Sequence, residues 1–479
     1  MQRSIKKTGS ILVAVLLLAS HPVLSQLADP AQGEAQASAK PEAQPGAATP
    51  AAELARWFAM AAEAYDDQDH QRWAEALENL HRLRPFNYDF MRQLVMAYAL
   101  TDQTSKAFNI MLKMQQQGLS VDWDQVEEVE SLRAYPLYQH LNDLMVGAGE
   151  PGGSARILWD IDGQYPMPEA LAHDPKTGRV FVGTVRDGLV LVRGPESDQF
   201  EVFASPDDTP GLNAVFDLLV DQQRGHLWIA TASTSHYRHS RQADFGRTAL
   251  LKLDLESGEK LGEYRVLPDR TPHLLGAMDL ASDGTIYAAD GLTPVIYKLA
   301  PGDERPKAFV GNPLFASLRG IALSADESRL YVVDYDMGVF FFELETGSGF
   351  ALGIPETLNL GGIDGLYQWK DSLVVIQNGV TPQRVLRLDL DPSGTRVASV
   401  ASLVVAQPAF DSPTFGTMAG DDLIFLAANH WNRVDNNGRP ATRPLPDIPV
   451  MRAAVDKAQN VMVGEQALEE LKRASGHQN

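Results

Sequence analysis

The sequence contains no cysteine among its 479 residues. This absence excludes disulfides, thiolate metal sites, a cysteine nucleophile and a lipid-modified N-terminal cysteine. Long apolar runs are also scarce. The run Ile11 to Ala19 is too short to cross a bilayer, and no later stretch reaches the roughly 18 uninterrupted apolar residues that a membrane helix needs. We therefore expect no membrane span once an N-terminal signal is removed.

Positive charge is in short supply. The chain has 41 Lys and Arg against 62 Asp and Glu, a formal net charge of −21. Binding to nucleic acid needs a concentrated positive surface, so we expect no nucleic-acid partner. The sequence also lacks a Gly-rich phosphate loop, a nucleophile elbow, an HExxH motif and an EF-hand pattern. Phosphotransfer, serine-hydrolase and zinc-protease chemistry therefore have no motif behind them.

The N-terminus has the layout of a secretory signal. Arg3, Lys6 and Lys7 precede the apolar run, and the small residue Ser25 lies directly before Gln26, so we predict a signal peptide over residues 1–25 and a periplasmic or secreted protein. An uncleaved N-terminal anchor is the alternative. Residues 26–50 are rich in Ala, Pro, Gln and Glu and predict a disordered linker.

Residues 51–147 show the hydrophobic period of helices. Ala64-Tyr65 recurs as Ala97-Tyr98, Ala74 as Ala107 and Pro85 as Gly118, each 33 residues on. This region resembles a short tetratricopeptide array, whose repeat is 34 residues long. The resemblance implies a concave surface that recruits a protein partner. A plain helical cap on the rest of the protein is the other interpretation.

The C-terminal two-thirds repeats a unit of short strands and tight turns, of which Arg319 to Gly347 is the clearest copy. Six copies follow one another at steps of 47, 59, 44, 43 and 50 residues, which is the spacing of propeller blades apart from one insertion. We predict a mainly β protein, with a six-bladed β-propeller over residues 155–455 preceded by a small all-α domain. Unrelated strands in a sandwich are the alternative.

The ends of the propeller region also carry predictions. Val450 to Val455 is expected to close the ring by pairing with residues near Arg156 to Asp160. Residues 456–479 are expected to form a C-terminal helix, at Glu465 to Ser475, and a tail.

Candidate site residues come from the first column of the aligned copies, because the innermost strand of each blade ends at the shared axis. That column reads Glu169, Phe216, Met278, Arg319, Asp364 and Thr414. Three polar residues beside these positions or at the end of a later strand are added as ligand-binding candidates: Asp217, Asp279 and His430.

Through PEALAHD, MDLASDGTIYAAD, RGIALSADESRLYVVD and GIDGLYQWKDSLVV, residues 164–431 resemble the senescence marker protein, gluconolactonase and luciferin-regenerating enzyme family of six-bladed propellers. The resemblance implies a divalent metal held by a Glu, two Asn and an Asp, the Asp also serving as acid or base. The Glu and Asp match Glu169 and Asp364, whereas the two Asn positions hold Met278 and Arg319. A thioether and a guanidinium do not suit a hard cation.

We therefore predict no cofactor, with Ca²⁺ bound through Glu169 and Asp364 only if the family site is retained. Arg319 is expected to replace the metal by spanning both carboxylates. Two functions remain open. The first is an exported binding or scaffold protein, whose helices recruit a partner and whose propeller binds a small polar or anionic ligand. The alternative is a lactone or ester hydrolase that uses Asp364 as the catalytic base.

The insertion from Ser233 to Thr248 contains the densest cationic cluster of this acidic chain. It is expected either to clamp an anionic ligand over the mouth of the propeller or to form a solvated loop. A zinc site at His236, His239 and Asp244 is weakly indicated by their spacing.

Overall fold

The computed structural model describes residues 50–312 and 314–461. The predicted signal peptide, the predicted linker up to residue 49 and the helix expected at Glu465 to Ser475 lie outside these residues. The chain divides into two compact units, residues 1–83 and 84–479. The border between the units thus falls within the predicted helical region of residues 51–147. No helix in the described part of the chain is both long and apolar enough to cross a membrane.

The described part of the first unit is a helical hairpin of α2 (Pro50–Asp66) and α3 (His70–Leu83). Ala64 and Ala74 are buried and let the helices approach each other. The ring of Tyr65 lies 5.0 Å from that of Trp73 and fills the space beside them. The hairpin predicted from the sequence repeat is present, while membership of the tetratricopeptide family stays a prediction.

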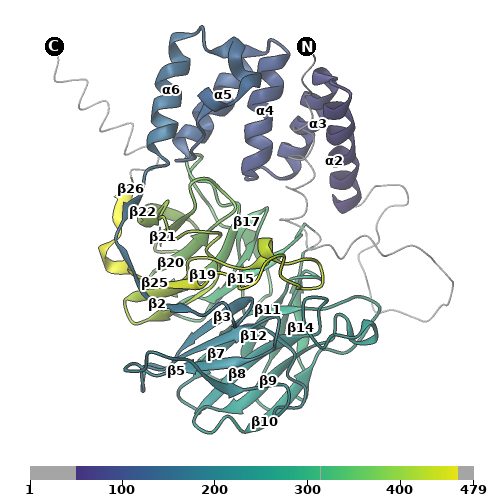
Figure 1. The fold of residues 1–479 in the computed structure, drawn as a ribbon, viewed down its shortest axis with the longest axis vertical. Coiled ribbons are helices and arrows are strands. Elements are labelled where there is room, and N and C mark those ends of the chain that lie inside the picture. The colour runs from purple at the N-terminus through teal and green to yellow at the C-terminus, as the bar shows by residue number, and fades with distance from the viewer. Residues whose placement is uncertain (1–49, 313, 462–479) are drawn as a thin grey trace, which may run out of the picture. The chain divides into compact units, whose positions relative to one another are not determined.

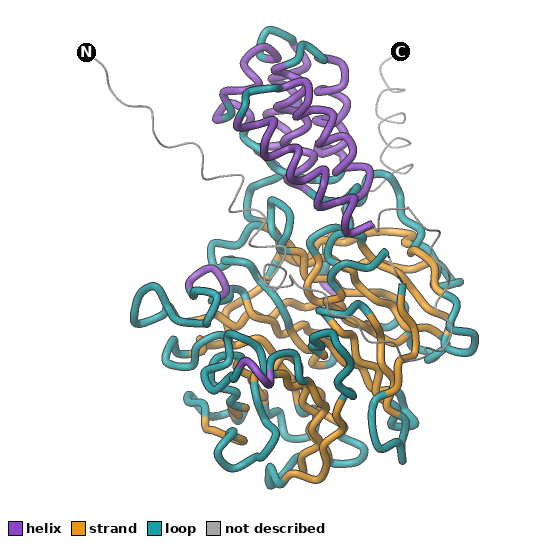
Figure 2. Tube along the Cα trace, turned by 90° about the vertical axis from the view of Figure 1, so that its right-hand side faces the viewer, coloured by secondary structure: helices purple, strands orange, loops and turns teal. Residues whose placement is uncertain are grey.

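The second unit begins with helices α4 (Tyr88–Leu100), α5 (Thr104–Gln116) and α6 (Pro136–Gly147). Two short 3₁₀ helices, η2 (Trp123–Gln125) and η3 (Glu127–Leu132), lie between α5 and α6. Asn87 caps α4 by accepting a hydrogen bond of 3.0 Å from the Phe90 N–H. The described helices are purple in Figure 2 and the strands orange.

The strands of the second unit form six antiparallel sheets, which are the blades of a propeller (Figure 1). Blade 1 comprises β3 (Pro168–His173), β4 (Val180–Thr184), β5 (Val190–Arg193) and β6 (Glu201–Ala204). Blade 2 comprises β7 (Ala214–Asp221), β8 (His226–Ala232), β9 (Thr248–Asp254) and β10 (Lys260–Arg265). Blade 3 comprises β11 (Leu275–Leu280), β12 (Ile286–Asp290), β13 (Val295–Leu299) and β14 (Lys307–Gly311).

The other three blades follow the same plan. Blade 4 comprises β15 (Leu318–Leu323), β16 (Arg329–Asp334), β17 (Gly338–Glu343) and β18 (Gly349–Ala351). Blade 5 comprises β19 (Ile363–Trp369), β20 (Ser372–Gln377), β21 (Arg384–Leu390) and β22 (Val397–Val405), extended by β1 (Gly152–Gly153) and β26 (Gln459–Val461). Blade 6 comprises β23 (Gly416–Ala419), β24 (Asp422–Leu426), β25 (Ile448–Ala454) and β2 (Ala155–Ile161).

The blades form a closed ring. The first strands of successive blades contact one another in the order β3, β7, β11, β15, β19, β23 and back to β3. Strand β2 enters blade 6 by pairing with β25, with Arg156 opposite Arg452 and Asp160 opposite Pro449. The six-bladed propeller and its closure by two distant segments were both predicted from the sequence, and the strand pairing confirms them.

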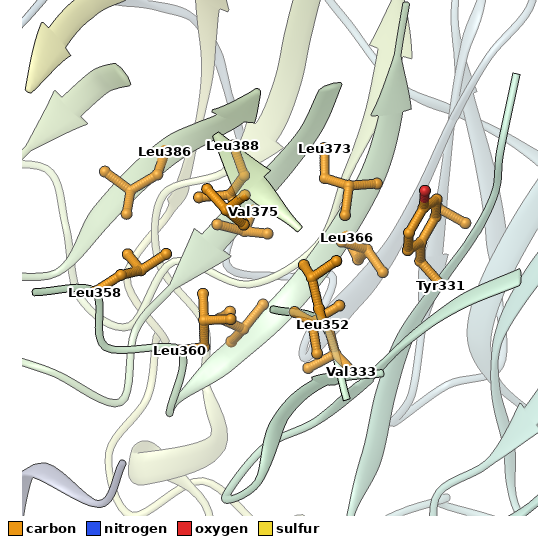
Figure 3. Packing of buried hydrophobic residues seen from close by; sticks show 14 of the residues in the cluster. Tyr331, Val333, Leu352, Leu358, Leu360, Leu366, Leu373, Val375, Leu386 and Leu388 are labelled. Carbon is orange, nitrogen blue, oxygen red and sulfur yellow. The ribbon is translucent and has the colours of Figure 1, made fainter. Parts of the chain in front are cut away.

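The hydrophobic core lies between neighbouring blades, because one face of each sheet packs against the preceding blade and the other face packs against the following blade. Figure 3 shows one such layer, in which Tyr331 and Val333 of blade 4 pack with Leu366, Leu373 and Val375 of blade 5. All five are less than 3% exposed. This packing holds the first strands in place around the axis.

Helix α5 is joined to blade 5 through a buried arginine. Arg384 donates from Nε to the side-chain oxygen of Gln377 at 2.6 Å, and from Nη1 to the carbonyls of Gln117 and Gly118 at 3.1 and 3.3 Å. Gln117 is the C-cap of α5. Within the described residues no carboxylate pairs with Arg384. The partial negative charge of the helix C-terminus therefore stabilises this cation.

Candidate active site at the hub of the propeller

A break in strand pairing marks the same position in five of the six first strands. The pairing register skips Glu169, Phe216, Gly276 and Asp364, and in blade 4 it skips Arg319 together with the glycine that follows. A bulged residue leaves the ladder, and its side chain is re-aimed. The bulges therefore position the polar groups of blades 1, 4 and 5 at the axis.

The register corrects one part of the sequence alignment. Gly276, rather than Met278, occupies the position in blade 3 that is equivalent to Arg319. Met278 pairs with Ala288 and lies in the core between blades 2 and 3. The alignment was displaced by two residues because a sequence pattern does not show where a bulge interrupts the strand.

Glu169 is a buried carboxyl group with one described hydrogen-bond donor. The indole Nε1 of Trp431 donates to its Oε2 at 2.8 Å. Burial raises the pKa of Glu169 from 4.5 to about 8. The Trp431 hydrogen bond opposes this rise, the Asp364 charge adds to it and the Arg319 charge opposes it. At neutral pH Glu169 therefore keeps its proton and can donate it.

Asp364 and Arg319 form an ion pair whose charges act on Glu169. The Arg319 Nε lies 3.5 Å from the Asp364 Oδ1, and neither atom makes a hydrogen bond to any described residue. Asp364 accepts a hydrogen bond at Oδ2 from the Asn378 side chain. Burial raises the pKa of Asp364, while the Arg319 charge and the Asn378 hydrogen bond oppose that rise. Oδ1 therefore remains an open acceptor next to a cation.

The predicted role of Arg319 is thus found for one carboxyl group and not for the other. Arg319 pairs with Asp364, but no ion pair or hydrogen bond joins it to Glu169 among the described residues. Trp431 binds Glu169 instead. The Arg319 guanidinium also lies over the ring of Tyr335, 5.4 Å from its centroid. This cation–π contact helps to fix the position of the Arg319 side chain.

Two of the candidate ligand residues link neighbouring blades. Asp217 accepts hydrogen bonds from the backbone N–H groups of Leu218 and Met278, at 2.8 and 2.6 Å. Asp279 likewise accepts from Leu280 and Leu323, at 2.8 and 2.6 Å. Burial raises the pKa of Asp217 to about 7 and that of Asp279 to about 6. All four carboxylate oxygens are used by the backbone, so we assign these residues to structure.

His430 also has a structural place. Its Nδ1 accepts a hydrogen bond of 3.1 Å from the Met167 N–H, and its Nε2 donates to the Pro446 carbonyl at 2.8 Å. Burial lowers the pKa of His430, which keeps the ring neutral. Both ring nitrogens are therefore engaged, and the neighbouring Trp431 is the residue that reaches the hub.

The insertion lies between β8 and β9, as the long step in the repeat predicted. His236 is buried, and its ring lies edge-on to that of Trp431 with the centroids 4.9 Å apart. Burial lowers the pKa of His236 to about 4, and Arg186 adds to this effect. No group of three or more metal-ligating side chains occurs in residues 50–312 and 314–461, so the weak zinc prediction gains no support. The insertion contacts the hub through His236.

The hub does not fit the divalent cation that the family resemblance implies. Its two carboxyl groups are Glu169 and Asp364, and Asp364 is already paired with the Arg319 guanidinium. Gly276 offers no side-chain donor. A calcium ion needs six or more oxygen ligands and is repelled by a neighbouring cation. The chemistry of these side chains therefore favours an arginine-based site.

Sequence reasoning missed two hub residues, Asn378 and Tyr335. Each follows directly after the second strand of its blade. Tyr335 donates a hydrogen bond of 3.0 Å to the side-chain oxygen of Asn378, which in turn donates to Asp364. In blade 6 the end of a later strand had already drawn attention to His430. Applying that signal to every blade would have found both residues.

The raised pKa of Glu169 predicts a pH-dependent stability. Between pH 4.5 and about 8 the unfolded chain has lost this proton while the folded protein retains it, so the free energy of unfolding falls as pH rises through this window. Glu169→Gln stays neutral and should lessen the fall. We expect the melting temperature of Glu169→Gln, relative to wild type, to be higher at pH 8.5 than at pH 5.5.

Glu343→Gln is the control, because Glu343 pairs with Arg329 on blade 4 and is 31% exposed. Its melting temperature should differ from wild type by the same small amount at both pH values. A Glu169→Gln difference that does not change with pH would show that Glu169 is ionised in the folded protein at neutral pH.

Comparison with known proteins bears on the fold. No family model matches the sequence, and no curated protein matches it. Among solved structures, a luciferin-regenerating enzyme is similar at 15% identity and a TM-score of 0.46, covering 65% of this chain and 98% of its own. Regucalcin, a calcium-binding protein from Agrobacterium tumefaciens, is similar at 14% identity and a TM-score of 0.44, covering 64% and 96%.

The aldose sugar dehydrogenase of Streptomyces coelicolor, solved with bound PQQ, is similar at 15% identity and a TM-score of 0.42, covering 64% of this chain and 99% of its own. The six-bladed fold itself is established by the strand pairing of this chain. Function has to come from the site, because one fold hosts many activities.

Proposed function

We propose that the hub hydrolyses a small lactone or ester by acid–base chemistry of Glu169, Asp364 and Arg319, without a metal. The observation that carries this proposal is the pair of atoms without a hydrogen bond, Asp364 Oδ1 and Arg319 Nε, whose charges act on the protonated Glu169. Glu169 accepts from an indole N–H whereas Asp364 faces a guanidinium, and two acids in different environments are the usual basis of acid–base catalysis.

Each hub group has one step in the reaction. Asp364 takes a proton from water as the water oxygen attacks the carbonyl carbon of the substrate. Arg319 stabilises the negative charge that develops on the carbonyl oxygen. Glu169 gives its proton to the ester oxygen as the carbon–oxygen bond breaks. The proton on Asp364 then returns to Glu169 through solvent, and one water has been consumed for each hydroxy acid formed.

A lactone assay in the presence of a chelator tests the proposal. The protein is dialysed against EDTA, and δ-valerolactone hydrolysis is followed by pH-stat at pH 7. We expect turnover that EDTA does not reduce and added Ca²⁺ does not raise, because the hub side chains do not fit a cation. Activity on no lactone or ester, or activity only after Ca²⁺ is added, would contradict the proposal.

Binding without turnover is the second candidate function. The cation–π contact with Tyr335 and the ion pair with Asp364 hold Arg319 in a fixed orientation, and a fixed guanidinium suits recognition of a carboxylate. Saturable binding of a lactone that is recovered unchanged would favour this function. Recruitment of a protein by the helices, and export of the chain, stay predictions.

A further inference from the structure

A group of cations lies on the loops that surround Trp431. We call it the cationic rim and define it as Arg186, Arg238, His239, Arg439 and Arg443. All but Arg186 are exposed. Asp187 and Asp435 interact with Arg186. On a chain with a net charge of −21, this local excess of positive charge needs an explanation.

Three segments far apart in the sequence build the rim. The Arg238 N–H donates to the Arg186 carbonyl at 2.8 Å, and the Arg238 guanidinium lies 2.7 Å from Asp187. The Arg186 guanidinium donates to the carbonyls of His236, at 3.1 Å, and Asn437. Burial and the charges of Arg238 and Arg439 lower the pKa of Arg186. The fold therefore brings like charges together at an electrostatic cost.

The rim is connected to the hub by direct contacts. Arg186 binds the backbone of His236, the His236 ring lies against Trp431, and Trp431 donates to Glu169. Gly438 allows the loop of Arg439 to come close: a Cβ there would lie 2.6 Å from the His236 carbonyl oxygen. Two residues, His236 and Trp431, thus separate the rim from the proposed proton donor.

We propose that the cationic rim selects substrates that carry a carboxylate in addition to the ester or lactone group. This inference rests on the proposed function, since it names the substrate class of the same site. Arginine forks bind carboxylates through two parallel hydrogen bonds. A local positive field on an acidic surface also raises the concentration of small anions where the protein as a whole would repel them. While the rim binds the carboxylate of such a molecule, Arg319 at the hub polarises the carbonyl of its ester or lactone group.

Binding of a non-hydrolysable probe tests the rim independently of turnover. Tetrahydrofuran-2-carboxylate and tetrahydrofuran-2-carboxamide have similar shapes and differ in charge. Calorimetric titration compares both with wild type and with the double variant Arg238→Glu, Arg439→Glu. We expect the double variant to weaken carboxylate binding by at least about tenfold, because two attractive charges become repulsive. Amide binding should change by less than about twofold, because the amide carries no net charge and charges beyond about 10 Å are screened.

The matched control reverses two arginines outside both the rim and the insertion, Arg265→Glu with Arg452→Glu. Arg265 pairs with Glu263 on blade 2, and Arg452 pairs with Asp422 on blade 6. This control changes the net charge equally, so carboxylate affinity should stay within about twofold of wild type. Melting temperature and circular dichroism establish that each variant is folded, and Arg238→Gln with Arg439→Gln gives a milder second test.

The result that overturns the inference is equal carboxylate affinity in wild type and the rim variant, or an equal loss for carboxylate and amide. Tight binding of inorganic phosphate without binding of the carboxylate would also overturn it. If the rim variant loses carboxylate affinity as expected but the wild-type protein turns over no lactone, only the hydrolase proposal is contradicted. The two failures can therefore be told apart.

Discussion

Asp364→Asn should lower kcat/KM for lactone hydrolysis by about 10³-fold, since general acid–base groups contribute about 10² to 10⁴-fold. The asparagine keeps the shape of the side chain and removes the basic Oδ1 that lies beside Arg319. Glu169→Gln, which can still accept the Trp431 hydrogen bond, should lower kcat/KM by about 10²-fold through loss of the transferable proton. Initial rates at saturating and limiting lactone measure both effects.

The control for these two variants is Asp411→Asn. Asp411 pairs with Arg433 on blade 6, and its side chain is 50% exposed, so its loss should leave kcat/KM within about twofold, as expected of an exposed ion pair. Melting temperatures identify any variant that loses activity by unfolding. Full activity in folded Asp364→Asn would remove the base from the mechanism and leave binding without turnover as the better function.

Arg384→Ala should cost about 3 kcal/mol of stability, because it leaves Gln377 and two helix-terminal carbonyls without donors, each worth about 1–3 kcal/mol when buried. Removal of a buried cation offsets part of this loss. Burial lowers the pKa of Arg384 to about 10. The destabilisation should be largest where α5 meets blade 5. Hydrogen exchange of the backbone amides in residues 104–120 should therefore quicken.

Arg452→Ala is the matched control for Arg384. Arg452 also lies in a strand of the propeller, but its side chain is 42% exposed and pairs with Asp422. We expect it to cost less than about 1 kcal/mol and to leave exchange in α5 unchanged. If Arg384→Ala also left exchange in residues 104–120 unchanged, the arginine would not be what holds α5 to the propeller.

The architecture was predictable because it repeats. A hydrophobic pattern that recurs every 43 to 59 residues indicates the number of blades. The strand-like segment left over at Val450 to Val455 indicated the closure, because a ring of complete blades needs a last strand from the other end of the repeat region. The placement of Glu169, Arg319 and Asp364 at one hub followed from the same repeat. The register of blade 3 did not, because its bulge at Gly276 leaves no mark in the sequence.

Side-chain contacts between distant segments were not predictable from the sequence. Trp431 and Glu169 lie 262 positions apart, and nothing in the sequence pattern pairs them. Arg384 resembles an ordinary strand cation until the carbonyls of Gln117 and Gly118 are seen beside it. Such pairings depend on how the ring and the helices assemble, and a single sequence does not record them.

The pH dependence of kcat/KM in EDTA is the most direct test of a hub that works through a protonated Glu169. We predict that wild-type kcat/KM for δ-valerolactone falls as pH rises through about 8, where Glu169 loses its proton. In Glu169→Gln the smaller residual kcat/KM should show no such fall. A wild-type profile that stays level through pH 8, or activity that disappears with the chelator, would contradict the account.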